Sequence, residues 1–363
     1  MKNLPISIQT LAKIRENDCV FVDKTEMVTQ LVKRAGAYFL SRPRRFGKSL
    51  LLDTFKELFE GNRALFQGLY IEDKWDWSKI YPVLRFDFSE GHFSDSDELE
   101  KELICQLKLQ MKHHGVECKG ESAPALFRAA IQAVQQKYQQ QVVVLIDEYD
   151  KPIRDNICDP KLATEIQRTL NGFYSVLKSQ SAHIQFLFIA GVTKPFTANM
   201  FGGLNHLQDI SLDRRYSTIC GYTKQDLTIA FSEYLADVDW QQLELLFGGY
   251  HFDGETVYKP SDILAHIDRT YKPDQSEIDS EQLSILLERF RQQQYSMPEE
   301  MTFEVGEETL GPFDVERVNP ITLMYQMGYL ALDQISETGF GELCYQLKVP
   351  NQTTRTALRP YFT

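Results

Sequence analysis

A short polar segment, residues 41–49, carries residue types that bind phosphate, and it reads S-R-P-R-R-F-G-K-S. It follows an apolar run that predicts a strand, residues 38–40, and opens onto a stretch that predicts a helix, residues 49–60. Backbone amides at such a helix start would surround phosphate oxygens, Lys48 would reach the β- and γ-phosphates, and the Ser49 hydroxyl would bind Mg²⁺. The residues expected to contact a nucleotide lie in this loop or at the helix start: Arg44, Arg45, Phe46, Gly47, Lys48, Ser49 and Leu50.

A second segment, residues 142–150, supplies two adjacent carboxylates. It reads V-V-V-L-I-D-E-Y-D, so an apolar strand would deliver Asp147 and Glu148 at its end. Asp147 would hold the water shell of the metal ion that Ser49 binds, and Glu148 would polarise the attacking water as a general base. The two segments together predict binding of a nucleoside triphosphate with Mg²⁺.

The phosphate-binding segment departs from the usual pattern G-x-x-x-x-G-K-[S/T], because Arg42 stands at the first glycine. Glycine is needed where a loop turns tightly or approaches phosphate. An arginine fits there if its φ is negative, with Pro43 setting the next turn, and Arg42, Arg44 and Arg45 would then add positive charge beside the anion. Taken alone, the segment could also be a solvated basic loop at a helix start. The carboxylate strand favours the nucleotide site.

Composition is that of a globular protein with two domains. The 363 residues exceed the length at which one core usually stops growing, and 43% apolar and 25% charged residues are ordinary values. No apolar run approaches the roughly 18 to 20 residues of a membrane span, and residues 1–10 have no signal pattern. The six cysteines form no C-x-x-C pair, which argues against a zinc site or disulfide framework. We expect a cytoplasmic protein without a membrane partner, and the net charge of −12 argues against a surface devoted to nucleic acid.

Short apolar runs that alternate with helical stretches predict an α/β fold with a parallel sheet covered on both faces. The expected strands are residues 20–22, 38–40, 83–88, 142–146 and 184–190. The expected helices are residues 25–33, 49–60, 97–113, 123–139 and 162–180. One strand lies between the loop and the carboxylate strand, and a glutamate follows the metal aspartate. This pattern indicates a P-loop nucleoside triphosphatase of the additional-strand, catalytic-glutamate type.

Two further polar positions follow the last of these strands. Thr193 would lie at a carboxyl strand end, where it could bond the γ-phosphate or the attacking water, and the alternative is a turn cap before Pro195. Arg215 follows a strand-like segment, residues 210–212, and precedes an expected helix, residues 224–236. It could stabilise charge on the γ-phosphate of its own or a neighbouring subunit, and the alternative is a solvated surface charge.

The composition shifts after residue 238, which predicts two domains. Residues 1–238 would form the nucleotide-binding domain with its helical lid, and residues 239–363 a mainly helical domain with several tight-turn signals. In the second domain residues 279–294 are expected to form a helix. Its end is expected to be winged-helix-like, with a helix over residues 321–332 and a strand over residues 343–349.

Several phrases of the sequence resemble the bacterial AAA-ATPase-like family. They are V-D-K-T from Val22, Y-F-L-S-R-P-R-R-F-G-K-S-L from Tyr38, I-D-E-Y-D-K-P-I from Ile146, G-G-L-N-H-L-Q-D-I-S-L-D from Gly202 and C-G-Y-T from Cys220. The resemblance covers residues 4–235, and later phrases resemble the domain that follows in the same proteins. In that family arginine at the first glycine is normal and an arginine is kept at the place of Arg215. For Lys48, Ser49, Asp147 and Glu148 the resemblance implies the roles given above.

Many members of that family continue into a PD-(D/E)XK nuclease domain, in which carboxylates and a lysine hold a metal for phosphodiester cleavage. After Pro260 no Asp or Glu is followed two residues later by Lys. The chain is therefore expected to be a form without the nuclease or a piece that ends before it.

Three functions remain open from the sequence. The first is a Mg²⁺-dependent ATPase whose hydrolysis switches the arrangement of domains or subunits, with a partner or an appended nuclease as its target. The second is a regulatory module that binds ATP with little turnover. The third is an adaptor that acts through residues 240–363 on DNA or a protein. The carboxylates at Asp147 and Glu148 favour the first, and the lack of an N-K-x-D base-reading motif favours ATP over GTP.

Overall fold

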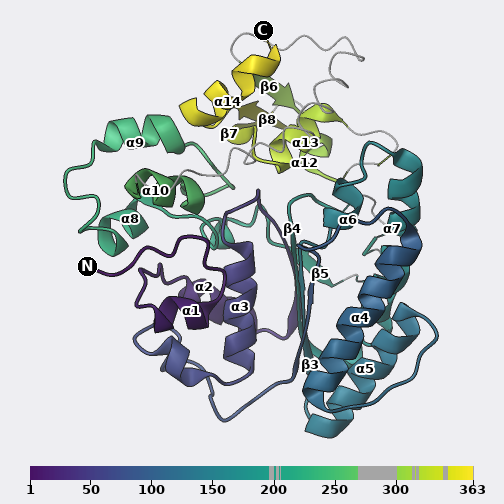
Figure 1. Ribbon diagram of the computed structural model, residues 1–363. Helices are drawn as coiled ribbons and strands as arrows, with labels where there is room; N and C mark the ends of the chain where they lie inside the picture. The colour runs from purple at the N-terminus through teal and green to yellow at the C-terminus, as the bar shows by residue number, and fades with distance from the viewer. Residues whose placement is uncertain are drawn as a thin grey trace.

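A parallel sheet of five strands forms the centre of the part of the chain described by the computed structural model (Figure 1). The structure describes residues 1–195, 200–201, 204, 206–268, 301–312, 315, 319–337 and 342–362. The strands lie in the order β2-β3-β4-β1-β5, and each pairs in parallel with its neighbours. Their bounds are β1 Gly36–Ser41, β2 Val83–Asp87, β3 Val142–Asp147, β4 Ile184–Gly191 and β5 Leu207–Asp209.

Helices cover both faces of this sheet, as the alternation of strands and helices predicts (Figure 1). One face packs against α1 Leu11–Glu16, α2 Thr25–Val32 and α3 Lys48–Phe59, and the other against α4 Ser96–His114, α5 Ala123–Tyr138 and α7 Pro160–Ser179. Successive strand residues point to opposite faces. In β1, therefore, Tyr38 and Leu40 belong to the first cluster, and Ala37 and Phe39 belong to the second.

The sequence around the long helices explains where they begin and end. The Asp95 side chain accepts a hydrogen bond from the Glu98 backbone at the start of α4, and Gly115 ends this helix in the left-handed region with φ +59°. Asp159 caps α7 in the same way, with Pro160 at the first helical position. These local signals let sequence patterns locate both helices closely.

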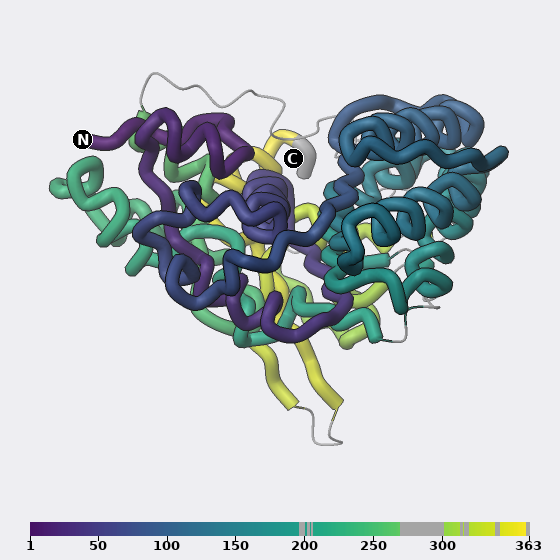
Figure 2. The backbone as a smooth tube through the Cα atoms, turned by 90° about the horizontal axis from the view of Figure 1, so that it is seen from below, coloured from purple at the N-terminus to yellow at the C-terminus, as the bar shows by residue number. Residues whose placement is uncertain are grey.

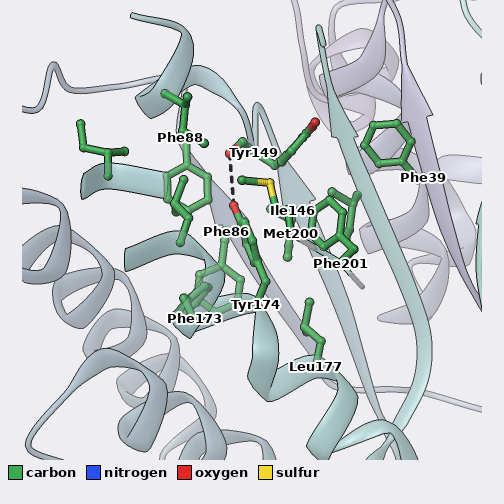
Figure 3. Close-up of a cluster of buried hydrophobic side chains, with 14 of the residues drawn as sticks. Phe39, Phe86, Phe88, Ile146, Tyr149, Phe173, Tyr174, Leu177, Met200 and Phe201 are labelled. Carbon is green, nitrogen blue, oxygen red and sulfur yellow. Dashed lines mark hydrogen bonds between the residues drawn. The ribbon is translucent and has the colours of Figure 1, made fainter. Parts of the chain in front are cut away.

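Aromatic side chains fill the cluster on the face covered by α4, α5 and α7 (Figure 3). The ring of Phe86 lies edge-on to Phe127 and Phe173, with centroid distances of 4.9 and 5.2 Å. The Tyr174 hydroxyl donates to the Tyr149 carbonyl oxygen at 3.2 Å, the dashed line in Figure 3. This bond ties the segment just after the two carboxylates to the centre of α7.

Two strand predictions are wrong. Residues 20–22 form no strand although all three are described, and the neighbouring Cys19 forms an isolated bridge with Asn3. Val20 instead packs in a third cluster with the helices after residue 223. The strand-like segment expected at residues 210–212 is also displaced, because β5 ends at Asp209. β5 has only three residues, two of them polar, so it lacks the apolar run by which the longer strands are recognised.

Short helices and a second sheet make up the rest of the described chain. The sheet is antiparallel with three strands in the order β6-β8-β7, and Figure 2 shows β7 and β8 extending away from the body of the molecule. In the described part every helix is too short or too polar to cross a membrane. The remaining elements are η1 Arg63–Phe66, α6 Lys151–Arg154, η2 Ser181–His183, η3 Arg214–Tyr216, α8 Lys224–Ala230, α9 Trp240–Phe247, α10 Pro260–Ile267, β6 Thr302–Val305, α12 Glu307–Leu310, α13 Pro320–Gln326, β7 Ala331–Glu337, β8 Leu343–Lys348 and α14 Gln352–Phe362.

Two helix predictions are too long. The helix expected over residues 224–236 ends at Ala230, and Phe231 and Leu235 pack from turns into the third cluster with α9 and α10. The helix expected over residues 321–332 ends at Gln326, because Gly328 takes φ +85° and the chain enters β7 soon after. The helix expected at residues 279–294 lies outside the described residues.

The C-terminal elements contact the carboxyl ends of the central strands, and Figure 1 shows them above that edge of the sheet. A Cβ atom added at Gly328 would lie 2.8 Å from the Cβ atom of Pro43, which follows β1. The Gln326 side chain accepts a hydrogen bond from the backbone of Lys194, which follows β4, at 3.0 Å. The end of α13 therefore packs directly on the segments that leave β1 and β4.

The aromatic cluster predicts the stability cost of a single truncation. We expect Phe86→Ala to lower the free energy of unfolding by about 3 to 5 kcal/mol, because it leaves a cavity beside the stacked rings of Phe127 and Phe173. Urea denaturation measures this cost. The control is Leu109→Ala on α4, where the leucine is 62% exposed, and its effect is expected within about 0.5 kcal/mol of zero. Equal stabilities of the two variants would contradict this account of the core.

Candidate functional site

The loop between β1 and α3 takes its shape from the backbone of two residues. Gly47 precedes α3 with φ +98°, and an added Cβ atom would meet no other atom within 4 Å. Glycine is therefore required there for its backbone conformation and not for space. Arg45 also has a positive φ, +64°, which is uncommon for a residue with a side chain and occurs most often at functional sites.

Arg42 occupies the first glycine position without the positive φ that would require glycine. Its side chain is completely buried, and its Nη1 donates to the carbonyl oxygens of Ser211 at 2.7 Å and Ser41 at 2.9 Å. Its guanidinium carbon lies 3.9 Å from the ring centroid of Phe252, and burial lowers the pKa of Arg42 to about 10. The expectation that Arg42 adds charge beside the anion is wrong, because its guanidinium is used to bind backbone carbonyls.

The Lys48 ammonium group lies inside the loop. Its Nζ atom is 3.2 Å from Glu148 Oε1 and donates to the carbonyl oxygens of Arg42 at 3.1 Å and Pro43 at 3.2 Å. Only 4% of the residue is exposed. The buried Lys48 ammonium group therefore contacts both the loop and the glutamate that follows β3.

Asp147 ends β3 as a completely buried carboxylate. Its Oδ1 accepts from the Glu148 backbone N–H at 3.0 Å, the Ser49 side chain also bonds it, and its buried Oδ2 has no hydrogen-bond partner. Arg85 Nη2 lies 3.8 Å from Oδ2. Burial, with repulsion from Glu148, raises the pKa of Asp147 to about 6. A buried carboxylate oxygen without a hydrogen-bond partner, next to a serine hydroxyl, is a donor set that fits a divalent cation.

Glu148 lies at the meeting point of two cationic side chains. Its Oε1 is 3.2 Å from Lys48 and its Oε2 is 3.1 Å from Arg154 Nη2. Burial alone would raise the pKa of Glu148, but attraction to the two cations outweighs it and lowers the pKa to about 2. The backbone of Glu148 has φ +49°, so its direction is fixed by an unusual conformation.

Asp150 connects this cluster to the chain after β4. Its Oδ2 accepts from Arg154 Nη1 at 2.8 Å and from the Thr193 backbone and hydroxyl at 2.9 and 2.7 Å. Its Oδ1 accepts from the Val192 backbone at 3.1 Å. Asp150, Arg154 and Thr193 are all at most 1% exposed. Their bonds therefore form in a nearly dry environment, where they are strong.

A cavity of about 560 Å³ lies over the loop. All seven residues predicted to contact a nucleotide line it, together with Glu148 and Arg154. Much of the remaining wall is apolar, and its apolar side chains include those of Pro5, Ile6 and Ile8, Phe21, and Leu264 of α10. The cavity therefore has a charged end at the loop and an apolar end between the N-terminal segment and α10.

Three predicted site residues do not line this cavity, and the first of them, Asp147, bonds to the Ser49 side chain, which does line it. The Thr193 hydroxyl donates to Asp150, so it is oriented within the core next to the cluster. Arg215 is exposed and pairs with Asp213, to which its Nε donates at 3.0 Å, and neither Thr193 nor Arg215 lines the cavity. The roles predicted for both residues stay predictions.

Sequence reasoning missed Arg154 and its partner Asp150. The signal was available, because an acid and an arginine four residues apart face each other on one helical turn. Arg154 lies only six residues after Glu148. The apolar end of the cavity was also missed, since it combines residues 5–9 with α10, which no local pattern connects.

Comparison with known proteins gives a family match over more than half of the chain. Residues 5–201 match the AAA-ATPase-like family described as "Predicted AAA-ATPase". An uncharacterized protein in the vnfD 5′ region of Azotobacter chroococcum mcd 1 is 40% identical over 359 residues, which are 98% of this chain and 69% of that protein. No solved structure matches the chain significantly.

The position of Lys48 predicts a loss of triphosphate affinity in Lys48→Ala. Hydrogen bonds to charged groups contribute roughly 1.5 to 3 kcal/mol each, so affinity should fall about tenfold or more while the fold remains. Titration with a fluorescent ATP analogue measures this. The control is Lys56→Ala on the same helix, since Lys56 pairs with Glu57 and Glu60 and does not line the cavity. Wild-type affinity in Lys48→Ala would remove the phosphate-loop assignment.

Proposed function

The chain belongs to the predicted AAA-ATPase-like family, and from this premise we propose that it binds ATP with Mg²⁺ and hydrolyses it. The observation that carries the proposal is the meeting of Lys48, Ser49, Asp147 and Glu148 at the carboxyl ends of β1 and β3. Ligands gather at this edge in open parallel sheets. The loop residues 44–50 would contact the nucleotide. We propose that ATP binding and hydrolysis take place in the cytoplasm.

Ser49 and Asp147 are the residues that would hold Mg²⁺. When bound, the ion would neutralise part of the negative charge of the phosphates. The Oδ2 atom of Asp147 supports this, because it is buried without a hydrogen-bond partner and its nearest cation, Arg85, is 3.8 Å away. In the described ranges no group of three His, Cys, Asp or Glu side chains gathers to offer a different metal site.

Glu148 would serve as the base that polarises the attacking water. Its lowered pKa keeps it ionised at neutral pH, so a carboxylate oxygen is available to orient and polarise the water, and a ligand that draws Lys48 away would make this carboxylate more basic. The three donors of the Lys48 ammonium group are directed at Glu148 and at the carbonyl oxygens of Arg42 and Pro43 in this arrangement, so Lys48 would turn at least one of them to the phosphates.

The order of the strands supports the additional-strand, catalytic-glutamate type of P-loop fold. β4 lies between β1, which leads to the loop, and β3, which ends in the two carboxylates. The apolar end of the cavity would hold the adenine ring of the nucleotide. Because the sequence has no N-K-x-D motif, ATP is proposed over GTP.

ATP hydrolysis would change the positions of the elements that follow the central sheet. Phe46, in the loop, packs edge-on against Tyr250 and Phe252 at centroid distances of 5.0 and 5.7 Å. Pro43, in the same loop, touches Gly328 beyond α13. A movement of the loop on nucleotide binding would therefore reach both contacts directly.

The C-terminal elements support the winged-helix-like prediction. Their order is β6, α12, α13, β7 and β8, and the first strand pairs with the last. The division at residues 1–238 and 239–363 is kept as a proposal. All three hydrophobic clusters cross it, and in the third Leu227 and Phe231 pack with Leu243 and Ile263.

The target of the switch is proposed as a protein partner or an appended activity such as a nuclease. DNA is less favoured, because six of the seven residues of α13 are buried in this arrangement. The second function is an ATP-binding module with little turnover, and the hydrolysis assay below separates it from the first.

Replacing each carboxylate separates binding from hydrolysis. Glu148→Gln keeps the shape of the site but removes the base, so we expect normal Mg²⁺-ATP affinity and slow single-turnover hydrolysis. Asp147→Asn should instead weaken the part of the affinity that depends on Mg²⁺. A wild-type rate in Glu148→Gln would show that another group activates water. Tight binding without measurable turnover in the wild type would favour the regulatory module.

Arg215 tests whether a second subunit completes the site. An arginine supplied from a neighbour can contribute about 10³ to 10⁵ in rate. Arg215→Ala is expected to bind ATP normally and lose most turnover, and mixing it with Lys48→Ala should partly restore activity if the arginine acts across subunits. Arg214→Ala, at the exposed neighbouring position, is the control. Turnover of Arg215→Ala within about twofold of wild type would return Arg215 to a surface role.

A further inference from the structure

Arg154 is a buried cation to which the proposed ATPase mechanism gives no role. It is 1% exposed, and its two terminal nitrogens reach different carboxylates, Asp150 at 2.8 Å and Glu148 at 3.1 Å. Its Nε atom is buried without a hydrogen-bond partner. Burying an arginine is costly unless its pairs are well formed, so this placement needs a specific reason.

The carboxylate on the other side of Arg154 is itself firmly held. Asp150 accepts hydrogen bonds from two consecutive backbone amides after β4, those of Val192 and Thr193, and from the Thr193 hydroxyl. Asp150 and Arg154 lie one helical turn apart at the ends of α6. The Arg154 guanidinium is therefore fixed to the end of β4 through Asp150 and cannot shift without leaving a buried charge unpaired.

The two cations at Glu148 have different second partners. Lys48 belongs to the loop, and in the proposed function its ammonium group also serves the phosphates. Arg154 lines the cavity as well, but its second partner is Asp150, which is anchored in the core. Arg154 can therefore hold the Glu148 carboxylate in one place while Lys48 turns to a ligand.

We propose that Arg154 is a positioning residue that holds Glu148, through the anchored Asp150, in the orientation from which it acts on water. The inference rests on the proposed ATPase function and deepens it. Arg154 acts through Glu148 and not on the nucleotide, so the effect of its loss should appear in turnover and not in affinity. This separates Arg154 from Arg215, which is exposed and for which a contact with the γ-phosphate is predicted.

The test compares Arg154→Gln and Arg154→Lys with the wild type in Mg²⁺-ATP binding and single-turnover hydrolysis. Misplacing a catalytic group by about 1 Å can lower the rate about 100-fold. We expect Arg154→Gln to lose about 10- to 100-fold in rate with affinity within about threefold of wild type. Arg154→Lys should lose less, because one ammonium group can reach a single carboxylate but lacks the fork that joins two. Arg168→Gln, at an exposed position on α7, controls for the loss of one positive charge.

A double variant distinguishes positioning from a general structural role. If Arg154 acts through Glu148, adding Arg154→Gln to Glu148→Gln should cause no further loss of rate, whereas independent structural damage would add to it. Guanidinium ion should also restore part of the rate in Arg154→Ala, because the vacated site opens into the cavity.

Each outcome of these assays decides the inference. Wild-type turnover in Arg154→Gln, or faster turnover, overturns it while leaving the ATPase proposal intact. An additive loss in the double variant also overturns it. If thermal melting shows that Arg154→Gln does not fold, Arg154→Lys carries the test, and a wild-type rate there with no rescue of Arg154→Ala overturns the inference. A wild-type protein that binds ATP but never hydrolyses it removes the proposed function first, and the role of Arg154 with it.

Discussion

Charge compensation in a nearly dry site is the constraint on which the rest of this structure depends. Three cationic and three anionic side chains meet at or beside the carboxyl ends of β1 and β3: Lys48, Arg85, Arg154, Asp147, Glu148 and Asp150. Each unpaired charge would cost several kcal/mol at such burial. Glu148 and Asp150 have cationic partners within 3.2 Å, whereas Arg85 lies 3.8 Å from Asp147. Asp147, beside Ser49, is therefore the carboxylate with the longest ion pair and an oxygen without a hydrogen bond, which is why a divalent cation fits there.

Arg42 shows how a loop can do without its first glycine. A glycine there would give the loop freedom, but Arg42 instead fixes it, because its guanidinium binds the carbonyl of Ser211 and stacks on Phe252. These partners lie after β5 and after α9, so one side chain holds together three distant parts of the chain. The cost of burying this guanidinium appears as its lowered pKa, and backbone carbonyls offset part of it. Arginine at the glycine position therefore places a charge on the side of the loop that packs against the rest of the protein, and not on the side that faces the cavity.

The sequence predicted the parts of this site that depend on local patterns. β1, β3 and α3 could be located because continuous apolar runs meet a glycine and a lysine at fixed spacing. Three features depend on contacts between distant segments and were not predicted: the direction of Arg42, the three-residue β5 and the apolar wall from residues 5–9. Arg154 is an intermediate case, since its spacing from Asp150 was visible but nothing in the sequence showed that both would be buried. The end of α13 was missed because Gly328 lies inside an otherwise apolar run.

The packing of α13 limits how the C-terminal elements can act. Sequence in DNA is read by side chains that reach base edges, and a helix with six of seven residues buried has none to offer. The β7–β8 hairpin projects from the body (Figure 2), but its outer part carries Glu337 and Glu342, and such charges disfavour phosphate. A role on DNA would therefore require α13 to leave Pro43 and Lys194. That separation would also move Gly328 away from the loop that holds Lys48, so in the proposed function nucleotide binding and exposure of α13 would be coupled through the same contact.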